Sequence, residues 1–276
     1  MAGEFGPGIC FVVVGKIAAA TAFITALWCQ DLSRQGAEAM RAGRYQEAER
    51  IYRELVKQSP DHAGWHGNLG LALHSQGRYR EAIDPLERSL KIRSSAGFST
   101  VLGIDYLKIG EPCKAIAPLE RSDRKPALAD AYSGCRRFRD AAVLYEKLGN
   151  SRAAARAYWQ ARDYDDARRV FVTIARQHSA DADFEYEYGD TLLRAEGAAV
   201  ALPHLERATS LVEGRAALGK AYIELRRFAD AISHLEAAVS ADPDLWLPLS
   251  RAYRATGRTA DADSALSEYK KRQSQN

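Results

Sequence analysis

Residues 214–221 have a spacing that could support phosphate chemistry. They read GRAALGKA and match the G-x-x-x-x-G-K pattern of a phosphate-binding loop, in which backbone amides and a lysine hold phosphate groups. Such a loop needs a Ser or Thr hydroxyl for Mg²⁺ after the lysine, but this chain has Ala221 there, and no strand is predicted before it. We therefore expect Gly219 to be a helix-packing residue and the segment not to bind a nucleotide.

A pair of histidines, His62 and His66, stands four residues apart near the predicted start of a helix. That spacing places both rings on one helix face, where they could supply two ligands to a metal ion. The sequence offers no evident third ligand, so surface or packing roles are expected. No H-E-x-x-H or G-x-S-x-G motif is present, and we expect a protein that is not an enzyme and has no cofactor or metal.

Composition and charge narrow the function further. Of the 276 residues, 46% are hydrophobic and 27% are charged, which is typical of a globular protein that buries a core. Lys and Arg number 39 and Asp and Glu number 36, so the net charge of +3 is too small to indicate a nucleic-acid partner. The four cysteines are scattered and form no C-x-x-C pair, which argues against a zinc site.

A repeated unit accounts for the chain after its first 29 residues. The words PLERS at Pro85 and Pro118, HLERA at His204 and HLEAA at His234 reveal it. One alanine anchors each copy and recurs at spacings of 34, 33, 26, 26, 34, 30 and 31 residues. The anchors are Ala48, Ala82, Ala115, Ala141, Ala167, Ala201, Ala231 and Ala262.

Each copy has the pattern of two helices. A small residue precedes the anchor by twelve positions, and an apolar residue, most often Tyr, follows three positions later on the same helix face. A Tyr, Leu or Phe follows four positions after the anchor, on the buried face of a second helix. The pattern therefore predicts a helical hairpin in each copy. The small residues are Gly36, Gly70, Gly103, Ala129, Ala155, Gly189, Gly219 and Ser250.

With its small residue, following Tyr, anchor Ala and later aromatic residue, this unit resembles the tetratricopeptide repeat (TPR). The resemblance covers about residues 30–271 and implies an all-α fold, an α-α superhelix (solenoid) of about eight TPR-like helical hairpins. The two 26-residue spacings near residues 125–151 are about eight residues too short for full-length helices, so we expect repeats four and five to be short. Residues 272–276 form a polar tail.

Stacked hairpins expose a curved surface lined by their first helices, which can receive a peptide or a partner helix. Candidate protein-binding residues are those that project from first helices away from the packing face. Trp159 and Tyr186 are favoured because large aromatic residues supply binding hot spots. The full set is Asn68, Arg152, Arg156, Trp159, Tyr186, Asp190, Lys220 and Arg251.

The competing interpretation of these charged residues is purely structural. Asp130 would pair with Arg156, and Asp190 with Lys220, between adjacent repeats. Some family members hold a C-terminal carboxylate with Lys, Asn and Arg residues of their first helices. Only Asn68 occupies a matching position here, so a clamp of that kind is not expected.

Residues 9–28 form an apolar run whose only charge is Lys16, and 20 helical residues are long enough to cross a bilayer. Lys16 near its middle opposes insertion, whereas the same lysine followed by residues 17–28 has the outline of a signal peptide. We expect residues 1–29 to be a signal peptide or membrane anchor, and the protein to be bacterial and exported or anchored rather than cytoplasmic. The alternative is a buried helix that packs on the first repeat.

The sequence thus predicts a non-enzymatic interaction scaffold that binds a protein or peptide segment in its concave groove, with membrane contact through residues 9–28. The alternative function is a structural component of a membrane or envelope assembly, which would use the ends and convex face of the solenoid.

Cys113 opens one predicted helix and Cys135 closes the next, and antiparallel packing could bring them together. A disulfide bond and two free thiols are both compatible with this placement.

Overall fold

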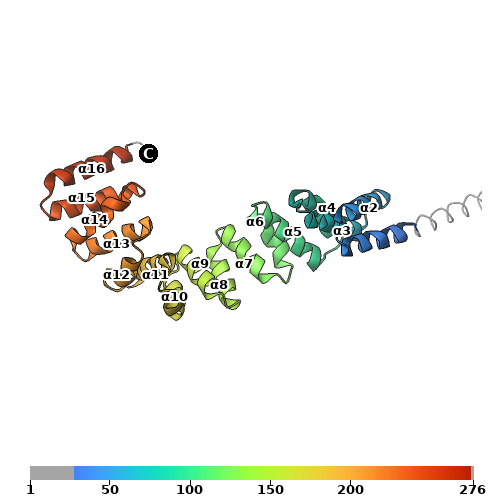
Figure 1. Ribbon diagram of the computed structural model, residues 1–276, viewed down its shortest axis with the longest axis horizontal. Coiled ribbons are helices and arrows are strands. Elements are labelled where there is room, and N and C mark those ends of the chain that lie inside the picture. Colours follow the sequence, from blue (N-terminus) through green and yellow to red (C-terminus); the bar gives the residue numbers. More distant parts are fainter. Residues whose placement is uncertain (1–27, 275–276) are drawn as a thin grey trace, which may run out of the picture. The chain divides into compact units, whose positions relative to one another are not determined.

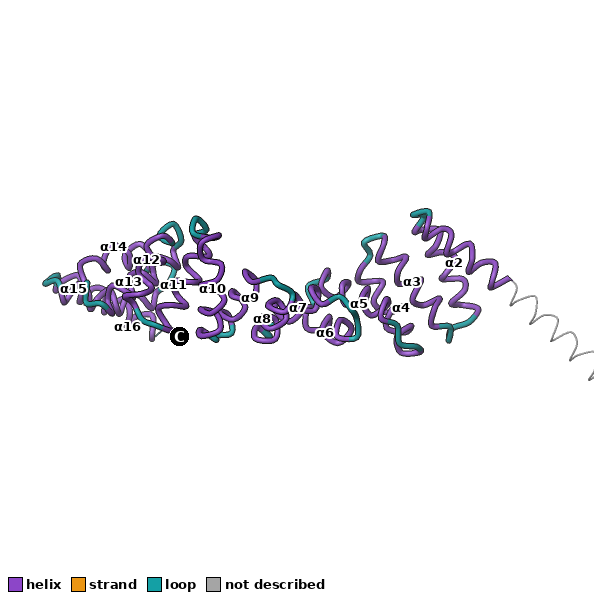
Figure 2. The backbone as a smooth tube through the Cα atoms, turned by 90° about the horizontal axis from the view of Figure 1, so that it is seen from below, coloured by secondary structure: helices purple, strands orange, loops and turns teal. Residues whose placement is uncertain are grey.

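The computed structural model of the protein describes residues 28–274, and every regular element in that range is a helix (Figure 1, Figure 2). The chain divides into two compact units, Met1–Gly134 (unit 1) and Cys135–Asn276 (unit 2). Most of the predicted signal or anchor segment, residues 1–27, lies outside the described residues. Within residues 28–274, no helix combines the length and hydropathy that a membrane span requires.

Unit 1 begins, among the described residues, with a helix over residues 28–41, in which Cys29 is a buried free thiol. Six more helices follow, and from α2 onward each packs on the next (Figure 1). They are α2 (Tyr45–Gln58), α3 (Ala63–Ser75), α4 (Tyr79–Ile92), α5 (Ala96–Lys108), α6 (Pro112–Glu120) and α7 (Lys125–Gly134).

Unit 2 continues the same alternation of first and second helices. Each of its helices contacts the next one along the chain. They are α8 (Phe138–Lys147), α9 (Ser151–Gln160), α10 (Tyr164–His178), α11 (Ala182–Ala195), α12 (Ala198–Arg207), α13 (Val212–Glu224), α14 (Phe228–Ala238), the short 3-10 helix η1 (Pro243–Leu245), α15 (Trp246–Ala255) and α16 (Thr259–Gln273). The prediction of an all-α fold built from helical hairpins is confirmed.

The predicted repeat positions form the core. All eight anchor alanines are fully buried. In four hairpins the small residue of the first helix is a glycine that packs against the leucine four residues after the anchor of the same hairpin, and in the first hairpin Gly36 packs against Tyr52. A Cβ at Gly103, for example, would lie only 2.4 Å from Cγ of Leu119, and one at Gly219 only 2.6 Å from a methyl group of Leu235. The two helices of a hairpin therefore cross where the absence of a side chain lets them approach.

The helices are short where the 26-residue spacings predict it. α7, α8 and α9 have 10 residues each, whereas α2 to α5 have 13 or 14. α6, in repeat three, is also short, with 9 residues, and α10, in repeat five, is full-length with 15. The continuous run of short helices thus extends from the end of repeat three to the start of repeat five, half a repeat earlier than predicted, and α12 and α15, with 10 residues each, are short as well.

The turn after the first helix requires a residue with positive φ. Glycine supplies it in four hairpins, at Gly43, Gly77, Gly110 and Gly257. Arginine adopts the same left-handed conformation in three others, at Arg136, Arg162 and Arg226, with φ of 62°, 60° and 59°. An L side chain there costs about 1 to 2 kcal/mol, so packing of the hairpin rather than local preference holds these turns.

A recurring hydrogen bond joins each of several hairpins to its predecessor. A tyrosine of the first helix donates to the glutamate that lies five residues after the preceding anchor, which in four of the five pairs belongs to one of the repeated words. The pairs are Tyr106–Glu87, Tyr132–Glu120 (2.9 Å), Tyr158–Glu146 (2.9 Å), Tyr222–Glu206 (3.1 Å) and Tyr253–Glu236 (2.5 Å). Burial, helped by the glutamate, raises the pKa of Tyr106, Tyr158 and Tyr253 to about 12, so these hydroxyls keep their protons at neutral pH.

Cys113 and Cys135 are both disulfide-bonded. The structure therefore does not have them as free thiols, which was the other state compatible with the sequence.

Replacing Gly103 by Leu is expected to lower the free energy of unfolding by about 1 to 3 kcal/mol, because a larger side chain at a close helix crossing forces strain. Chemical denaturation followed by far-ultraviolet circular dichroism measures the change. Gly97→Leu on the same helix is the control, since a Cβ there meets only Ser95 Oγ, at 3.9 Å, and stability should change by less than about 0.5 kcal/mol. Wild-type stability in Gly103→Leu would contradict this packing register.

Candidate protein-binding site

The first helices of unit 2 position most of the candidate residues. α9, α11, α13 and α15 contact one another in sequence, and their exposed sides form what we call the first-helix face. The residue directly after each small packing residue projects onto this face, because one step along a helix turns by about 100°. These residues are Arg156, Asp190, Lys220 and Arg251.

Arg152 and Arg156, one turn apart on α9, both pair with Glu187 of α11. Arg156 Nε lies 2.5 Å from Oε1 of Glu187, and Arg152 contacts Oε2. Glu187 is only 2% exposed, so two guanidinium groups compensate one buried carboxylate. The Arg152 guanidinium also lies 5.1 Å from the centre of the Phe184 ring. The two arginines thus hold α9 against α11, and because Arg152 also pairs with Asp181 Oδ2 at 4.0 Å, two carboxylates balance their two positive charges.

Trp159 and Tyr186 form an aromatic pair across the same two helices. Their ring centres are 5.8 Å apart in an edge-to-face arrangement. Trp159 Nε1 donates to Oδ2 of Asp190 at 2.8 Å, and the buried Asp190 also accepts from Arg194 Nε at 3.1 Å. Both rings are half-buried. The hydrogen bond and the ring contact therefore hold two large aromatic side chains in place while part of each stays open to solvent.

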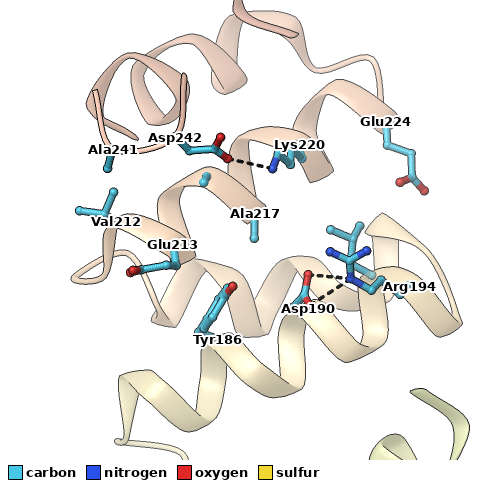
Figure 3. Close-up of a pocket in the computed structure, with 12 residues that line it drawn as sticks. Tyr186, Asp190, Arg194, Val212, Glu213, Ala217, Lys220, Glu224, Ala241 and Asp242 are labelled. Carbon is cyan, nitrogen blue, oxygen red and sulfur yellow. Dashed lines mark hydrogen bonds and ion pairs between the residues drawn. The ribbon is translucent and has the colours of Figure 1, made fainter. Parts of the chain in front are cut away.

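A cavity of about 420 Å³ lies between α11 and α13, beside this pair (Figure 3). The lining residues of α11 are Tyr186, Asp190, Leu193 and Arg194. Those of α13 include Val212, Glu213, Ala217 and Lys220. Three of the predicted binding residues therefore share one hollow on the first-helix face.

Lys220 and Arg251 differ in their partners. Lys220 Nζ pairs with Asp242 Oδ2 at 3.3 Å, across the cavity lining (Figure 3). The competing interpretation paired it with Asp190, but that carboxylate is engaged by the indole and guanidinium groups described above. Arg251 is exposed and makes no hydrogen bond or ion pair with any described residue. Its charge is therefore free to meet a ligand.

Asn68 is the one candidate in unit 1. It is half-buried on α3, and its side chain interacts with the hydroxyl of Tyr52 on α2. A second polar contact in unit 1 joins His74 Nδ1 to Asp105 Oδ1 at 2.5 Å, between α3 and α5. Asp105 is fully buried, and burial raises the pKa of its carboxyl group. Unit 1 thus uses these polar groups between its own helices, and none of them lines the cavity of about 450 Å³ that lies between α4, α5 and α6.

The glycines of the phosphate-loop pattern serve helix packing. Gly214 and Gly219 both lie within α13, not in a loop. A Cβ at Gly214 would lie 2.1 Å from the carbonyl oxygen of Ala208, and Gly219 packs on Leu235 of α14, as described above. The expectation of a packing role for Gly219 is therefore confirmed.

The two histidines of the metal pattern also have structural partners. His62 caps α3 by accepting a hydrogen bond from the backbone N–H of Trp65 and stacks on its ring at 4.0 Å. His66 is buried, and its Nε2 lies 2.7 Å from the carbonyl oxygen of Pro60. Within residues 28–274, no group of three or more His, Cys, Asp or Glu side chains is placed to hold a metal ion.

Sequence reasoning missed Glu187, the partner of two candidate arginines. A signal for it was present, since it lies two residues before Gly189, and Asn68 has the same position relative to Gly70. Asp242 was missed for a different reason. It lies in the connection between α14 and η1, where the repeat pattern assigns no position.

Among solved structures, a chain in the structure of Naa15/Naa10 bound to HypK-THB aligns with a TM-score of 0.54 and 18% identity. The alignment covers 82% of this chain but only 39% of that one. A tetratricopeptide repeat protein from Parabacteroides merdae aligns with a TM-score of 0.44 and 15% identity, over 81% of this chain and 98% of that one. At such identities the first likeness shows the fold alone. No curated protein matches the chain.

One family matches most of the repeat region. The sequence model of the tetratricopeptide repeat matches residues 34–97, 152–216 and 216–276. These segments contain all anchor alanines except Ala115 and Ala141, which precede the two shortened spacings. The match covers more than half of the chain, and the helical hairpins pack as the repeat pattern requires. The chain therefore belongs to the tetratricopeptide repeat family.

Proposed function

We propose that this protein is a non-enzymatic scaffold that binds an extended segment of a partner protein along the first-helix face of unit 2. The observation that carries the proposal is the aromatic pair Trp159–Tyr186 beside a cavity of about 420 Å³. Large aromatic side chains next to a pocket are the usual anchors of protein interfaces. Because Asp190 already fixes the indole, a partner would lose little side-chain entropy in using it.

The alternative function, a structural component of an assembly that uses the ends of the solenoid and its convex second-helix face, has weaker support. Exposed apolar residues do occur there, namely Val143 on α8, Val172 on α10 and Val200 on α12. They stand one residue before, two after and five after their anchors, which places them on one side of their helices but one turn apart, so none of the three helices repeats the exposed position of another. Single exposed apolar residues are ordinary on protein surfaces. We therefore favour the first-helix face.

The proposed location rests on sequence alone. Residues 9–28 contain a single charged residue, and we propose that residues 1–29 export the protein or anchor it at a membrane. Fractionation of the native cell tests this: we expect the chain with the membrane, or a processed chain outside the cytoplasm. Intact chain in the cytoplasmic fraction would contradict it.

The proposed binding face is tested by purifying crosslinked partners from the native cell with wild-type protein and with Trp159→Ala/Tyr186→Ala. We expect the partner band of the wild type to fall by about tenfold or more in this variant, because two anchors are lost together. Circular dichroism checks that the variant is folded.

The matched control is Val172→Ala/Val200→Ala, which truncates exposed side chains on second helices and should retain the partner. Loss of the partner in the control, with retention in Trp159→Ala/Tyr186→Ala, would favour the alternative function.

A further inference from the structure

The cavity between α11 and α13 has one carboxylate that makes no hydrogen bond or ion pair among the described residues. Asp190 and Asp242 pair with Arg194 and Lys220, as described above. Glu224 accepts a hydrogen bond from the backbone N–H of Ala198 at 3.2 Å and so caps α12. Glu213 is exposed and makes no hydrogen bond or ion pair with any described residue.

Tyr186 stands close enough to Glu213 for the two to interact electrostatically, at the same end of the cavity (Figure 3). Its hydroxyl makes no hydrogen bond within the described part of the chain. Burial, with Asp190 and then Glu213 adding to it, raises the pKa of Tyr186 to about 12. The phenol is therefore neutral at physiological pH and presents an uncharged, electron-rich ring beside a free carboxylate.

The rest of the lining suits an amphipathic side chain. Leu193, Val212, Ala216 and Ala217 supply apolar surface. Two cationic residues and four carboxylates line the cavity, so its charge is negative. A side chain with an aliphatic stem and a cationic head could place the stem on the apolar surface and the head between a carboxylate and an aromatic ring. A carboxylate-bearing side chain would instead meet Glu213 as a like charge.

We propose that this cavity receives a lysine or arginine side chain of the bound partner segment, with Glu213 as its ion-pair acceptor and the Tyr186 ring as its cation–π surface. The inference rests on the proposed function, since it names the side chain that the first-helix face selects. It makes Glu213 a specificity-determining residue.

The test uses a display library of random peptides selected on the full chain, followed by affinity measurements with single synthetic peptides. We expect one position of the selected peptides to be enriched in Lys or Arg, and replacement of that residue by Ala to weaken binding by about tenfold. Glu213→Lys should weaken binding of the basic peptide by at least as much. It should also restore binding to a peptide in which the basic residue is Glu.

Asp165→Lys is the matched control. Like Glu213, Asp165 is the second residue of its helix, is exposed and has no partner among the described residues, so both changes put the same charge at a helix N-terminus. We expect Asp165→Lys to leave the affinity unchanged.

Two failures of this test are distinguishable. Peptides that lose binding in Trp159→Ala/Tyr186→Ala but have no enriched basic residue, or do not respond to Glu213→Lys, would overturn the cavity proposal and leave the proposed function intact. Recovery of no peptide that depends on the aromatic pair would contradict the proposed function, and the cavity proposal with it.

Discussion

The double variant Arg152→Ala/Arg156→Ala is expected to lose about 3 kcal/mol of stability, because breaking a buried ion pair from one side leaves an uncompensated charge. Both arginines neutralise Glu187, whose side chain is almost completely buried. No other cationic group pairs with that carboxylate among the described residues. The loss should lie at the low end of the range for buried pairs, since Arg156 is half-exposed. Urea denaturation followed by circular dichroism measures it.

The control adds Glu187→Leu to the same two substitutions. It removes the buried charge together with its partners, so most of the lost stability should return. Wild-type stability in the double variant, or a further loss on adding Glu187→Leu, would show that the arginines do not support the fold. They would then return to the set of residues free to bind a partner.

Phe184→Ala is expected to lower the free energy of unfolding by about 3 to 5 kcal/mol, the usual result of emptying a large buried aromatic site. Phe184 is fully buried on α11 and contacts a cluster of rings from two helices. Its ring centre lies 5.3 Å from that of Phe171, 5.1 Å from that of His178 and 5.9 Å from that of Tyr188. The effect matters for function because α11 also carries Tyr186, half of the proposed anchor pair.

Val172→Ala is the control for this prediction. It follows Phe171 on α10 but is 60% exposed, and its truncation should change stability by less than about 0.5 kcal/mol. Thermal and chemical denaturation of both variants give the comparison. Equal stabilities would mean that the ring cluster does not hold α10 against α11.

The fold could be predicted from the sequence because each hairpin repeats the same contacts. A small residue, an anchor alanine and a large apolar residue at constant spacing are enough to define two helices and the side on which they meet. The structure has each anchor fully buried and Gly103 directly on Leu119. The extent of the shortened helices was predicted less well, because two reduced spacings do not say which helix loses the residues.

The contacts between repeats were only partly predictable. The glutamate of the repeated word was visible as a letter in PLERS, but its bond to the next tyrosine spans from 12 to 19 residues along the chain. Which acceptor a long side chain reaches depends on how far one helix is rotated against the next. The same limit explains why the competing structural interpretation paired Asp190 with Lys220, whereas Trp159 and Arg194 reach Asp190 in the structure.

The candidate site was located by its helix face rather than by its interactions. Projection away from the packing side selected Tyr186, Asp190 and Lys220, which the structure places around one hollow. It could not show that Arg152 and Arg156 both pair with a buried carboxylate, nor that Arg251 has no ion-pair partner among the described residues. Face assignment follows from helix periodicity, whereas charge balance requires the positions of side chains from neighbouring helices.

Site-specific photocrosslinking from unit 2 tests the central claim most directly. A photoreactive phenylalanine analogue replaces Val212, which is 41% exposed in the cavity lining, or Val172 on the second helix α10. Both are exposed valines on helices of one unit, so they differ mainly in the face from which they react. Binding along the first-helix face predicts a partner crosslink from residue 212 and little or none from residue 172. A crosslink from residue 172 alone, or equal crosslinks from both, would contradict it.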